Sequence, residues 1–266
     1  MRKALTDIWK EETDKDDDFV ASRNYCFGYS QEELIDNGYS ITDMLFLLAK
    51  GELPSKVQRS LLDALGVALC NPGPRHPATR AAMEVAVSKT RIPHILPISL
   101  VVMGGDLAAG GVEPAMRFMR LHRKKPAGEL VGLKLEEYAG SLEDTEIFPG
   151  FGPRFGQREP LYVNLAKRIR RRFANIDLPY LDWILGLDLE LEKRATIHAV
   201  RANGLAAAIL LDLGFHPRFG TPVVQWLAGP GLLAHGVEKS NKPLTDMPFV
   251  TDDSYHYTRD SGDDDD

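Results

Sequence analysis

The pattern of apolar and polar positions predicts a chain built from many helices. Apolar residues recur every three or four positions after Ser40 and again after Ser55, and serine often caps helix N-termini. Residues 40–43 (S-I-T-D) resemble a capping box, and the glycine and proline within 51–54 end that first helix. Alternating β-branched runs are scarce and none is paired through a hairpin turn, so the pattern predicts an all-α fold.

The remaining periodic stretches extend this prediction along the chain. Residues Met1–Ala21 are expected to form a loosely held leader, because they are charged and carry no helical period. Further helices are expected over Ala78–Lys89, after Pro97, and over Glu113–His122, Glu129–Ser141, Tyr162–Phe173, Pro179–Leu191 and Ala195–Leu213.

Composition narrows the class of protein. The chain has 266 residues and a formal net charge of −6, which gives no reason to expect a nucleic-acid partner. Cys26 and Cys70 have neither metal-ligand spacing nor a disulfide framework. The segment Met1–Asp18 lacks the apolar core of a signal peptide, and prolines, glycines and a charge interrupt the longest apolar run, Ile92–Gly111. We therefore expect a cytoplasmic protein without a membrane span or a bound metal.

The most unusual stretch is Phe148–Arg158, which reads F-P-G-F-G-P-R-F-G-Q-R. Its glycines and prolines prevent a helix, and Gly150 and Gly152 permit backbone angles that are closed to other residues. Arg154 and Arg158 add two permanent cations beside this open backbone. The combination suits a bulky anionic ligand, and an ordinary loop between helices is the alternative interpretation.

Several passages in the same order resemble the citrate synthase family, and most of all the citryl-CoA lyase module of ATP-citrate lyase. Residues 38–41 and 51–54 resemble G-Y-x-I and G-x-L-P, and residues 148–154 resemble P-G-F-G-H-R. Residues 202–205 (A-N-G-L) resemble V-D-G-L, and Asp212 resembles a second aspartate on that helix. Residues 231–235 with Glu238 resemble G-W-I-A-H-x-x-E, so the resemblance spans about Tyr25 to Tyr257.

This resemblance implies an all-α, citrate synthase-like architecture. A large helical domain would comprise residues 1–107 and 214–266, and a small helical domain, residues 108–213, would close over the active site. The resemblance also implies a homodimer or a higher oligomer.

The implied activity makes or cleaves a carbon–carbon bond between an acyl-CoA and a 2-oxo acid. The CoA thioester would be a substrate, with a small carboxylic or 2-oxo acid as its partner and no tightly bound cofactor. Arg154 matches the arginine that binds a substrate carboxylate, a task suited to a bidentate guanidinium. The residues that match the family's CoA-adenine loop are Phe148, Pro149, Gly150, Phe151 and Gly152.

The chain departs from the family at the positions that carry its acid–base chemistry. That chemistry uses an aspartate to remove a proton next to the thioester and histidines to stabilise the developing charges. An amide has no basic lone pair at pH 7, and proline and alanine do not titrate. Asn203 takes the place of the aspartate, while Pro153, Ala109 and Pro72 replace family histidines and Ala228 replaces an arginine.

Neighbouring residues offer replacements for the lost groups. His76 is a candidate base or carbonyl donor and Arg75 a candidate carboxylate ligand, although a loop histidine without catalytic function is the alternative. Asp106 is a candidate base under a different register and otherwise a turn residue, and the Asn203 amide could hold an enolate or thioester oxygen. The histidines interpreted as structural are His94, His198 and His235.

Two functions remain open. The first is a citrate synthase-like or citryl-CoA lyase-like enzyme with altered catalytic residues, in which His76, Asn203 and Arg154 carry the chemistry. The second is a homologue that binds a CoA thioester, lacks the family reaction and acts as a partner subunit. An enzyme of the same fold acting on a different thioester is a variant of the first.

Overall fold

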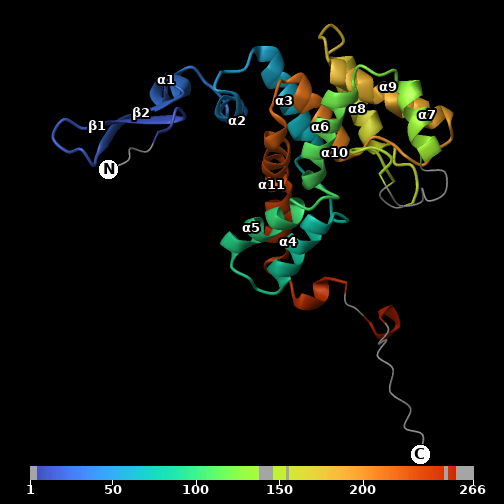
Figure 1. Ribbon diagram of the computed structural model, residues 1–266. Coiled ribbons are helices and arrows are strands. Elements are labelled where there is room, and N and C mark those ends of the chain that lie inside the picture. Colours follow the sequence, from blue (N-terminus) through green and yellow to red (C-terminus); the bar gives the residue numbers. More distant parts are fainter. Residues whose placement is uncertain (1–4, 138–145, 154–155, 249–250, 256–266) are drawn as a thin grey trace, which may run out of the picture. The chain divides into compact units, whose positions relative to one another are not determined.

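The computed structural model describes residues 5–137, 146–153, 156–248 and 251–255 (Figure 1). Contacts divide the chain into two compact units. Unit 1 comprises Met1–Asn71 and Met103–Ala228, and unit 2 comprises Pro72–Val102 and Gly229–Asp266. The predicted division into residues 1–107 with 214–266 and residues 108–213 stays a prediction.

Helices dominate both units, which confirms the all-α prediction. The N-terminal part of unit 1 contains α1 (Gln31–Asp36), α2 (Ile41–Lys50) and α3 (Lys56–Leu69). Its later part contains α6 (Val112–His122), α7 (Ala127–Glu137), α8 (Leu161–Arg172), α9 (Pro179–Lys193) and α10 (Ala202–Asp212). Unit 2 contains α4 (Pro77–Val87) and nearly all of α5 (Ile92–Met103), while α11 (Gly220–Lys239) begins in unit 1 and ends in unit 2.

A small antiparallel sheet near the N-terminus corrects the prediction for this region. Strand β1 (Trp9–Thr13) pairs with β2 (Ala21–Cys26), which pairs in turn with β3 (Tyr29–Ser30). Most side chains of β1 are exposed, so the strand shows no apolar alternation that could have revealed it. The expectation of a loosely held leader over Met1–Ala21 is therefore wrong for β1.

The local helix signals are confirmed at α2 and α3. The side chain of Ser40 accepts a hydrogen bond from the Asp43 N–H, and the Asp43 carboxylate accepts one from the Ser40 N–H at 2.7 Å. Ser55 and Gln58 form the same reciprocal pair at the start of α3. Gly51 ends α2 with a φ of +76°, a conformation that favours glycine.

Two helix boundaries differ from the prediction. Helix α5 starts before Pro97 and contains it as its sixth residue, where the proline removes one backbone hydrogen bond. Helix α10 begins at Ala202 and not at Ala195, because Ala199 and Val200 pair with the 148–152 loop instead. The last residues of the helix expected over Glu129–Ser141 lie outside the described residues.

Helix α10 is the centre of unit 1. Every residue from Asn203 to Leu211 is buried, and the helix packs against α3, α6, α8 and α9 (Figure 1). A helix that is apolar all round belongs in a core, and Gly204 together with 206–208 (A-A-A) keeps the backbone narrow enough for close neighbours. The N-terminus of α10 is thereby fixed beside the 148–152 loop.

Unit 2 has a small core of its own. Ala82, Ala86 and Ile95 are fully buried and pack together. A Cβ on Gly236 of α11 would collide with the Ile95 side chain, so α11 and α5 approach closely here. Lys89 donates from Nζ to two backbone carbonyls that follow α11, at 3.0 and 2.6 Å.

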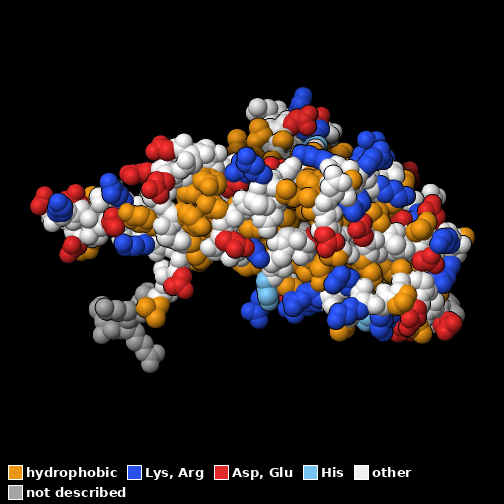
Figure 2. Space-filling model, turned by 90° about the horizontal axis from the view of Figure 1, so that it is seen from above, with side chains coloured by type: hydrophobic (Ala, Val, Ile, Leu, Met, Phe, Trp, Pro, Cys, Tyr) orange, Lys and Arg blue, Asp and Glu red, His pale blue; other side chains and the backbone are white. Residues whose placement is uncertain are grey.

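The surface mixes charges of both signs with apolar side chains. Figure 2 shows acidic and basic side chains interspersed on one face, with hydrophobic groups between them. Within the described ranges no helix has the length and apolar character needed to cross a membrane.

Candidate functional site

The 148–152 loop is bound to the chain segment that precedes α10. Phe148 and Phe151 form an antiparallel bridge, and Phe151 forms a second bridge with Val200. The Gly152 N–H donates to the carbonyl of Ala199 at 3.1 Å. The loop backbone is therefore fixed by hydrogen bonds within the protein before any ligand binds.

Gly150 brings this loop into direct contact with α10. Its φ is +91°, and its carbonyl accepts a hydrogen bond from the Arg201 N–H at 3.0 Å. A Cβ on Gly150 would lie 2.7 Å from the Cα of Gly204, and a Cβ on Gly204 would collide with the Gly150 carbonyl oxygen. Both glycines are required by the packing of two backbones.

The aromatic side chains of the loop point into the core. Phe148 is 1% exposed and packs edge-on against Phe151, with ring centroids 5.8 Å apart. Phe148 also stacks on Phe118 of α6 at 5.4 Å, and Phe118 lies 6.0 Å from Trp183 of α9. The aromatic rings anchor the loop, while the half-buried Pro149 lies nearer the surface.

A polar cluster surrounds the first turn of α10. The Glu146 Oε1 atom lies 2.9 Å from Nη1 of Arg201 and 3.5 Å from Nδ2 of Asn203. Arg201 also donates from Nη2 to the Leu107 carbonyl at 2.9 Å. We call Glu146, Arg201 and Asn203 the α10 polar cluster, because it joins a carboxylate, a guanidinium and an amide at one helix end.

Gly111, the residue before α6, closes one side of this cluster. Asn203 is only 4% exposed, and its Oδ1 accepts the Gly204 N–H at 3.1 Å. A Cβ on Gly111 would collide with Nδ2 of Asn203 and would lie 2.8 Å from the Asp106 carbonyl oxygen. Gly111 therefore leaves the space that the amide fills, while the Asp106 residue itself is exposed.

A buried ion pair supports the same segment from behind. Asp188 of α9 is almost fully buried, accepts the Val200 N–H at 3.2 Å through Oδ1, and pairs through Oδ2 with Arg158 at 2.8 Å. Arg158 also donates to the His198 carbonyl. Burial raises the pKa of Asp188, and the nearby Arg158 guanidinium opposes that rise. Arg158 thus serves an internal contact.

Asp212, at the other end of α10, caps α9. Its two carboxylate oxygens accept the backbone N–H groups of Tyr180 and Leu181, each at 2.9 Å. Burial raises the pKa of Asp212 to about 6, and these two hydrogen bonds oppose that rise. The aspartate that resembles a family residue therefore holds two helices together.

Two of the predicted site residues belong to unit 2. His76 is buried and caps α4, with its Nδ1 accepting the Ala78 N–H at 3.1 Å. Arg75 precedes it and is exposed. The buried position differs from that of an exposed loop histidine, and the catalytic assignments of His76 and Arg75 stay predictions.

The structure accounts for the other predicted residues as follows. Phe148, Gly150, Phe151 and Gly152 lie together with Asn203 in unit 1, whereas Arg154 lies outside the described residues. His235 lies in α11 with its Nδ1 atom 4.0 Å from the Glu238 carboxylate, one turn away.

Glu146 and Arg201 are not among the site residues predicted from the sequence. Arg201 precedes the first residue of α10, where the helix dipole disfavours a cation unless a carboxylate neutralises it. An arginine immediately before A-N-G-L was therefore a usable signal. Glu146 gave no comparable signal, because its partners are 55 and 57 residues away in the chain.

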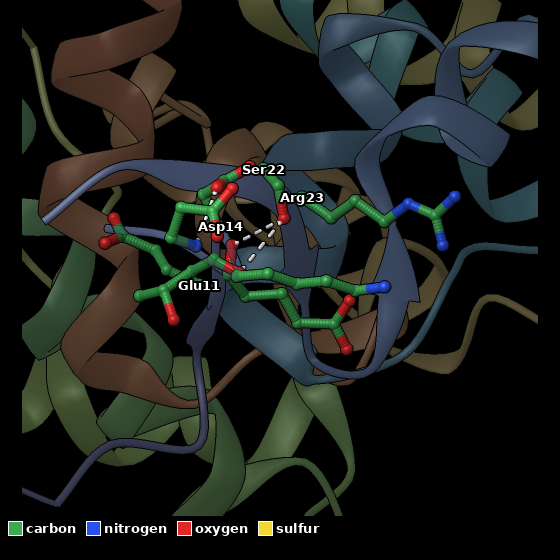
Figure 3. Close-up of a pocket in the computed structure, with 8 residues that line it drawn as sticks. Glu11, Asp14, Ser22 and Arg23 are labelled. Carbon is green, nitrogen blue, oxygen red and sulfur yellow. Dashed lines mark hydrogen bonds between the residues drawn. The ribbon is translucent and has the colours of Figure 1, made fainter. Parts of the chain in front are cut away.

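A separate hollow lies in the N-terminal hairpin. It measures about 650 Å³ and lies between the ends of β1 and β2, where Ser22 donates to the Glu12 carbonyl at 3.1 Å (Figure 3). Half of its eight lining residues are acidic, and it contains none of the predicted site residues.

Solved structures with known activities share this fold. Citryl-CoA lyase from Hydrogenobacter thermophilus superposes with a TM-score of 0.77 at 23% identity, covering 97% of this chain and 96% of that one. ATP citrate lyase from Methanothrix soehngenii, in complex with citrate and coenzyme A, gives 0.69 at 16% identity and covers 97% of this chain. This chain spans only 44% of that protein.

Citrate synthase from Thermotoga maritima gives a TM-score of 0.55 at 13% identity, covering 98% of this chain and 94% of that one. The sequence matches no protein-family model and no curated protein sequence. The superpositions confirm the architecture that the sequence motifs predicted: this chain has the citrate synthase-like fold.

Proposed function

We propose that this protein binds a CoA thioester and makes or cleaves a carbon–carbon bond between its acyl group and a 2-oxo acid. One observation carries the proposal: the superposition on citryl-CoA lyase extends over nearly the full length of both chains. A fold hosts more than one chemistry, so the reaction depends on the residues of the site.

The 148–152 loop supports the CoA part of this proposal. Buried Phe148 and Phe151 anchor it, and Gly150 and Gly152 are hydrogen-bonded to the 199–201 segment. A loop that is already ordered loses little conformational freedom on binding, which favours affinity. We propose that Phe148–Gly152 forms the adenine cradle, and that the thioester enters as substrate without a tightly bound cofactor.

His76 suits the role of hydrogen-bond donor better than that of base. Because its Nδ1 accepts the Ala78 N–H, the neutral ring carries its proton on Nε2. A ring in this tautomer can donate to a substrate carbonyl oxygen. We propose that His76 polarises the keto carbonyl and that Arg75 and Arg154 bind the carboxylates of the acid.

The assay for this function uses both directions of the reaction. Purified protein is incubated with citryl-CoA, and separately with acetyl-CoA and a panel of 2-oxo acids that includes oxaloacetate. Mass spectrometry identifies the products. Formation of acetyl-CoA and oxaloacetate, or of a condensed acid and free CoA, supports the proposal. Absence of turnover with every substrate contradicts it.

The second candidate is a CoA-thioester-binding subunit without the family reaction. The buried amide of Asn203 favours it, because an amide stands where the family has a basic carboxylate. A ligand at about 100 times its Kd stabilises the native state by about 2.7 kcal/mol. A rise in Tm with CoA and acyl-CoAs, without turnover, would favour this candidate over the first.

We further propose that the protein is a cytoplasmic homodimer or a higher oligomer. Helix α11 supports an assembly, because Trp226, Leu233 and Val237 expose large apolar side chains at helical spacing along it. Size exclusion with light scattering at micromolar concentration tests the assembly, and a monomeric mass would contradict it.

A further inference from the structure

We propose that Glu146 supplies the carboxylate that removes a proton from the carbon next to the thioester carbonyl. This inference rests on the proposed function and assigns its missing base. Asn203, which resembles the family's aspartate position, has an amide that cannot accept that proton. The base must come from another residue near the same point.

Glu146 is close to that point. Its Oε1 lies 3.5 Å from Nδ2 of Asn203, so the carboxylate directly contacts the amide at that position. Glu146 comes from the chain just before the proposed adenine cradle. A Cβ on Gly152 would lie 3.4 Å from the Cα and Cγ of Glu146, so the residue packs directly against the cradle.

Arg201 holds the carboxylate in this position. Its Nη1 contacts Oε1 at 2.9 Å, and its Nη2 is fixed by the Leu107 carbonyl at 2.9 Å. Both contacts of Glu146 are made through Oε1, and in the described part of the chain no hydrogen bond engages Oε2. The side chain of Glu146 is 27% exposed and that of Arg201 13%, so a substrate can reach the carboxylate.

The step balances without any other reagent. An oxygen of Glu146 forms an O–H bond as the C–H bond next to the thioester breaks, and the electron pair moves onto the thioester oxygen as an enolate. With a 2-oxo acid present, the enolate carbon bonds to the keto carbon as the thioester carbonyl re-forms, the electron pair of the keto π bond moves onto the keto oxygen, and the proton taken up by Glu146 balances the charge of that oxygen. Without the acid, the proton returns to carbon, or a deuteron from the solvent replaces it.

This exchange isolates the step from the rest of the reaction. The protein is incubated with acetyl-CoA in D₂O without an acid, and deuterium entering the acetyl group is followed by mass spectrometry. Glu146→Gln is expected to slow exchange about 100-fold or more, the usual contribution of a general base. Its Tm shift with CoA should match that of the unaltered protein, which shows that binding is retained.

Two further variants separate chemistry from structure. Glu113→Gln removes the carboxylate of the exposed Arg117 pair on α6, where the ions are 2.6 Å apart, and should leave exchange unchanged. The double variant Glu146→Gln/Asn203→Asp exchanges the amide and the carboxylate between the two positions. Exchange by the double variant should be at least about tenfold faster than exchange by Glu146→Gln, because a carboxylate is again present at the site.

The outcomes separate this inference from the function on which it rests. Loss in Glu146→Gln with recovery in the double variant supports it. Unchanged exchange in Glu146→Gln overturns the assignment of Glu146 and leaves the proposed function standing. Absence of exchange and of citryl-CoA turnover in the unaltered protein overturns both.

Discussion

Gly150 and Gly204 lie backbone against backbone, so closely that neither position accepts a side chain. A Cβ on Gly150 would lie 2.7 Å from the Cα and 3.1 Å from the amide nitrogen of Gly204. The contact joins the 148–152 loop to the first turn of α10. The position of Asn203, the residue before Gly204, depends on it.

The first prediction is that Gly204→Ala destabilises the protein. In an ordinary helix interior this change stabilises by about 1 kcal/mol, because alanine loses less backbone entropy than glycine. Here the added methyl collides with the Gly150 carbonyl oxygen, so we expect a loss of about 2 kcal/mol in the free energy of unfolding. Urea denaturation measures it.

Gly186→Ala is the matched control. Gly186 lies within α9, and an added Cβ would make only an ordinary contact of 3.9 Å with Ala127. This variant should be as stable as the unaltered protein or more stable by up to about 1 kcal/mol. A Gly204→Ala variant that behaves like Gly186→Ala would show that the loop and α10 do not touch as described.

The second prediction concerns the buried pair Arg158–Asp188. Replacement of Arg158 by Met leaves the buried carboxylate without its counterion, and we expect a loss of about 3 kcal/mol at pH 8. Burial already raises the pKa of Asp188, and loss of Arg158 raises it further. A raised folded-state pKa favours folding at low pH, so the loss should shrink as the pH falls toward 5.

Arg117→Met is the control for that variant. Arg117 pairs with Glu113 at 2.6 Å on the exposed surface of α6, and such pairs contribute about 0.5 kcal/mol. Urea denaturation at several pH values compares the two variants. Equal losses, or a loss in Arg158→Met that does not vary with pH, would contradict the buried ion pair.

The third prediction is a pH dependence of stability that comes from Asp212. Its pKa is about 6 in the folded protein and about 4 in the unfolded chain, so folding takes up a proton between these values. The stabilisation is complete below about pH 4 and is lost as the pH rises through 6. Unfolding measured at pH 5 and 7 should show a difference on the order of 1 to 2 kcal/mol.

Asp212→Asn tests the origin of that dependence. An amide presents one acceptor oxygen, so one of the N–H groups of Tyr180 and Leu181 loses its partner and the variant should be less stable overall. The difference between pH 5 and 7 should be smaller than in the unaltered protein. If the stability difference between pH 5 and 7 is as large as in the unaltered protein, groups other than Asp212 cause it.

Signals within a few residues of one another were readable in the sequence, whereas contacts between distant segments were not. The capping boxes at Ser40 and Ser55 depend on side chains three residues apart; the first was predicted as a capping box, and Ser55 was predicted as the start of a helix. Strand β1 was not predicted, because its mostly exposed side chains show no apolar alternation. Only its hydrogen bonds to β2 define it as a strand.

The candidate site divides in the same way. The glycines of the 148–152 loop marked a special backbone, but their partner Gly204 is more than fifty residues away and nothing local indicates it. Glu146 was not predicted for the same reason, because its partner Asn203 is 57 residues away in the chain. The resemblance to family motifs singled out Asn203, and only the fold revealed the Glu146 carboxylate beside it.

The fourth prediction tests the contact between Glu146 and Asn203. Asn203→Asp places a second carboxylate beside Glu146 Oε1, where the amide now lies at 3.5 Å. Two carboxylates this close do not both ionise readily, so the pKa of one rises. The variant should lose about 1 to 2 kcal/mol of stability at pH 8 and recover it as the pH falls toward 5.

Its control adds Glu146→Gln to the same chain. With one carboxylate and one amide at the contact, the extra pH dependence should disappear. Denaturation curves at pH 5 and pH 8 measure both variants. If Asn203→Asp shows no pH-dependent loss, the two side chains are not neighbours and the α10 polar cluster is wrong.

The most direct test of the proposed function is the incubation of the unaltered protein with citryl-CoA, followed by mass spectrometry of the mixture. The fold and the 148–152 loop predict acetyl-CoA and oxaloacetate as products, formed faster than by Glu146→Gln. Intact citryl-CoA after long incubation, together with no rise in Tm on adding CoA or acyl-CoAs, would contradict the account.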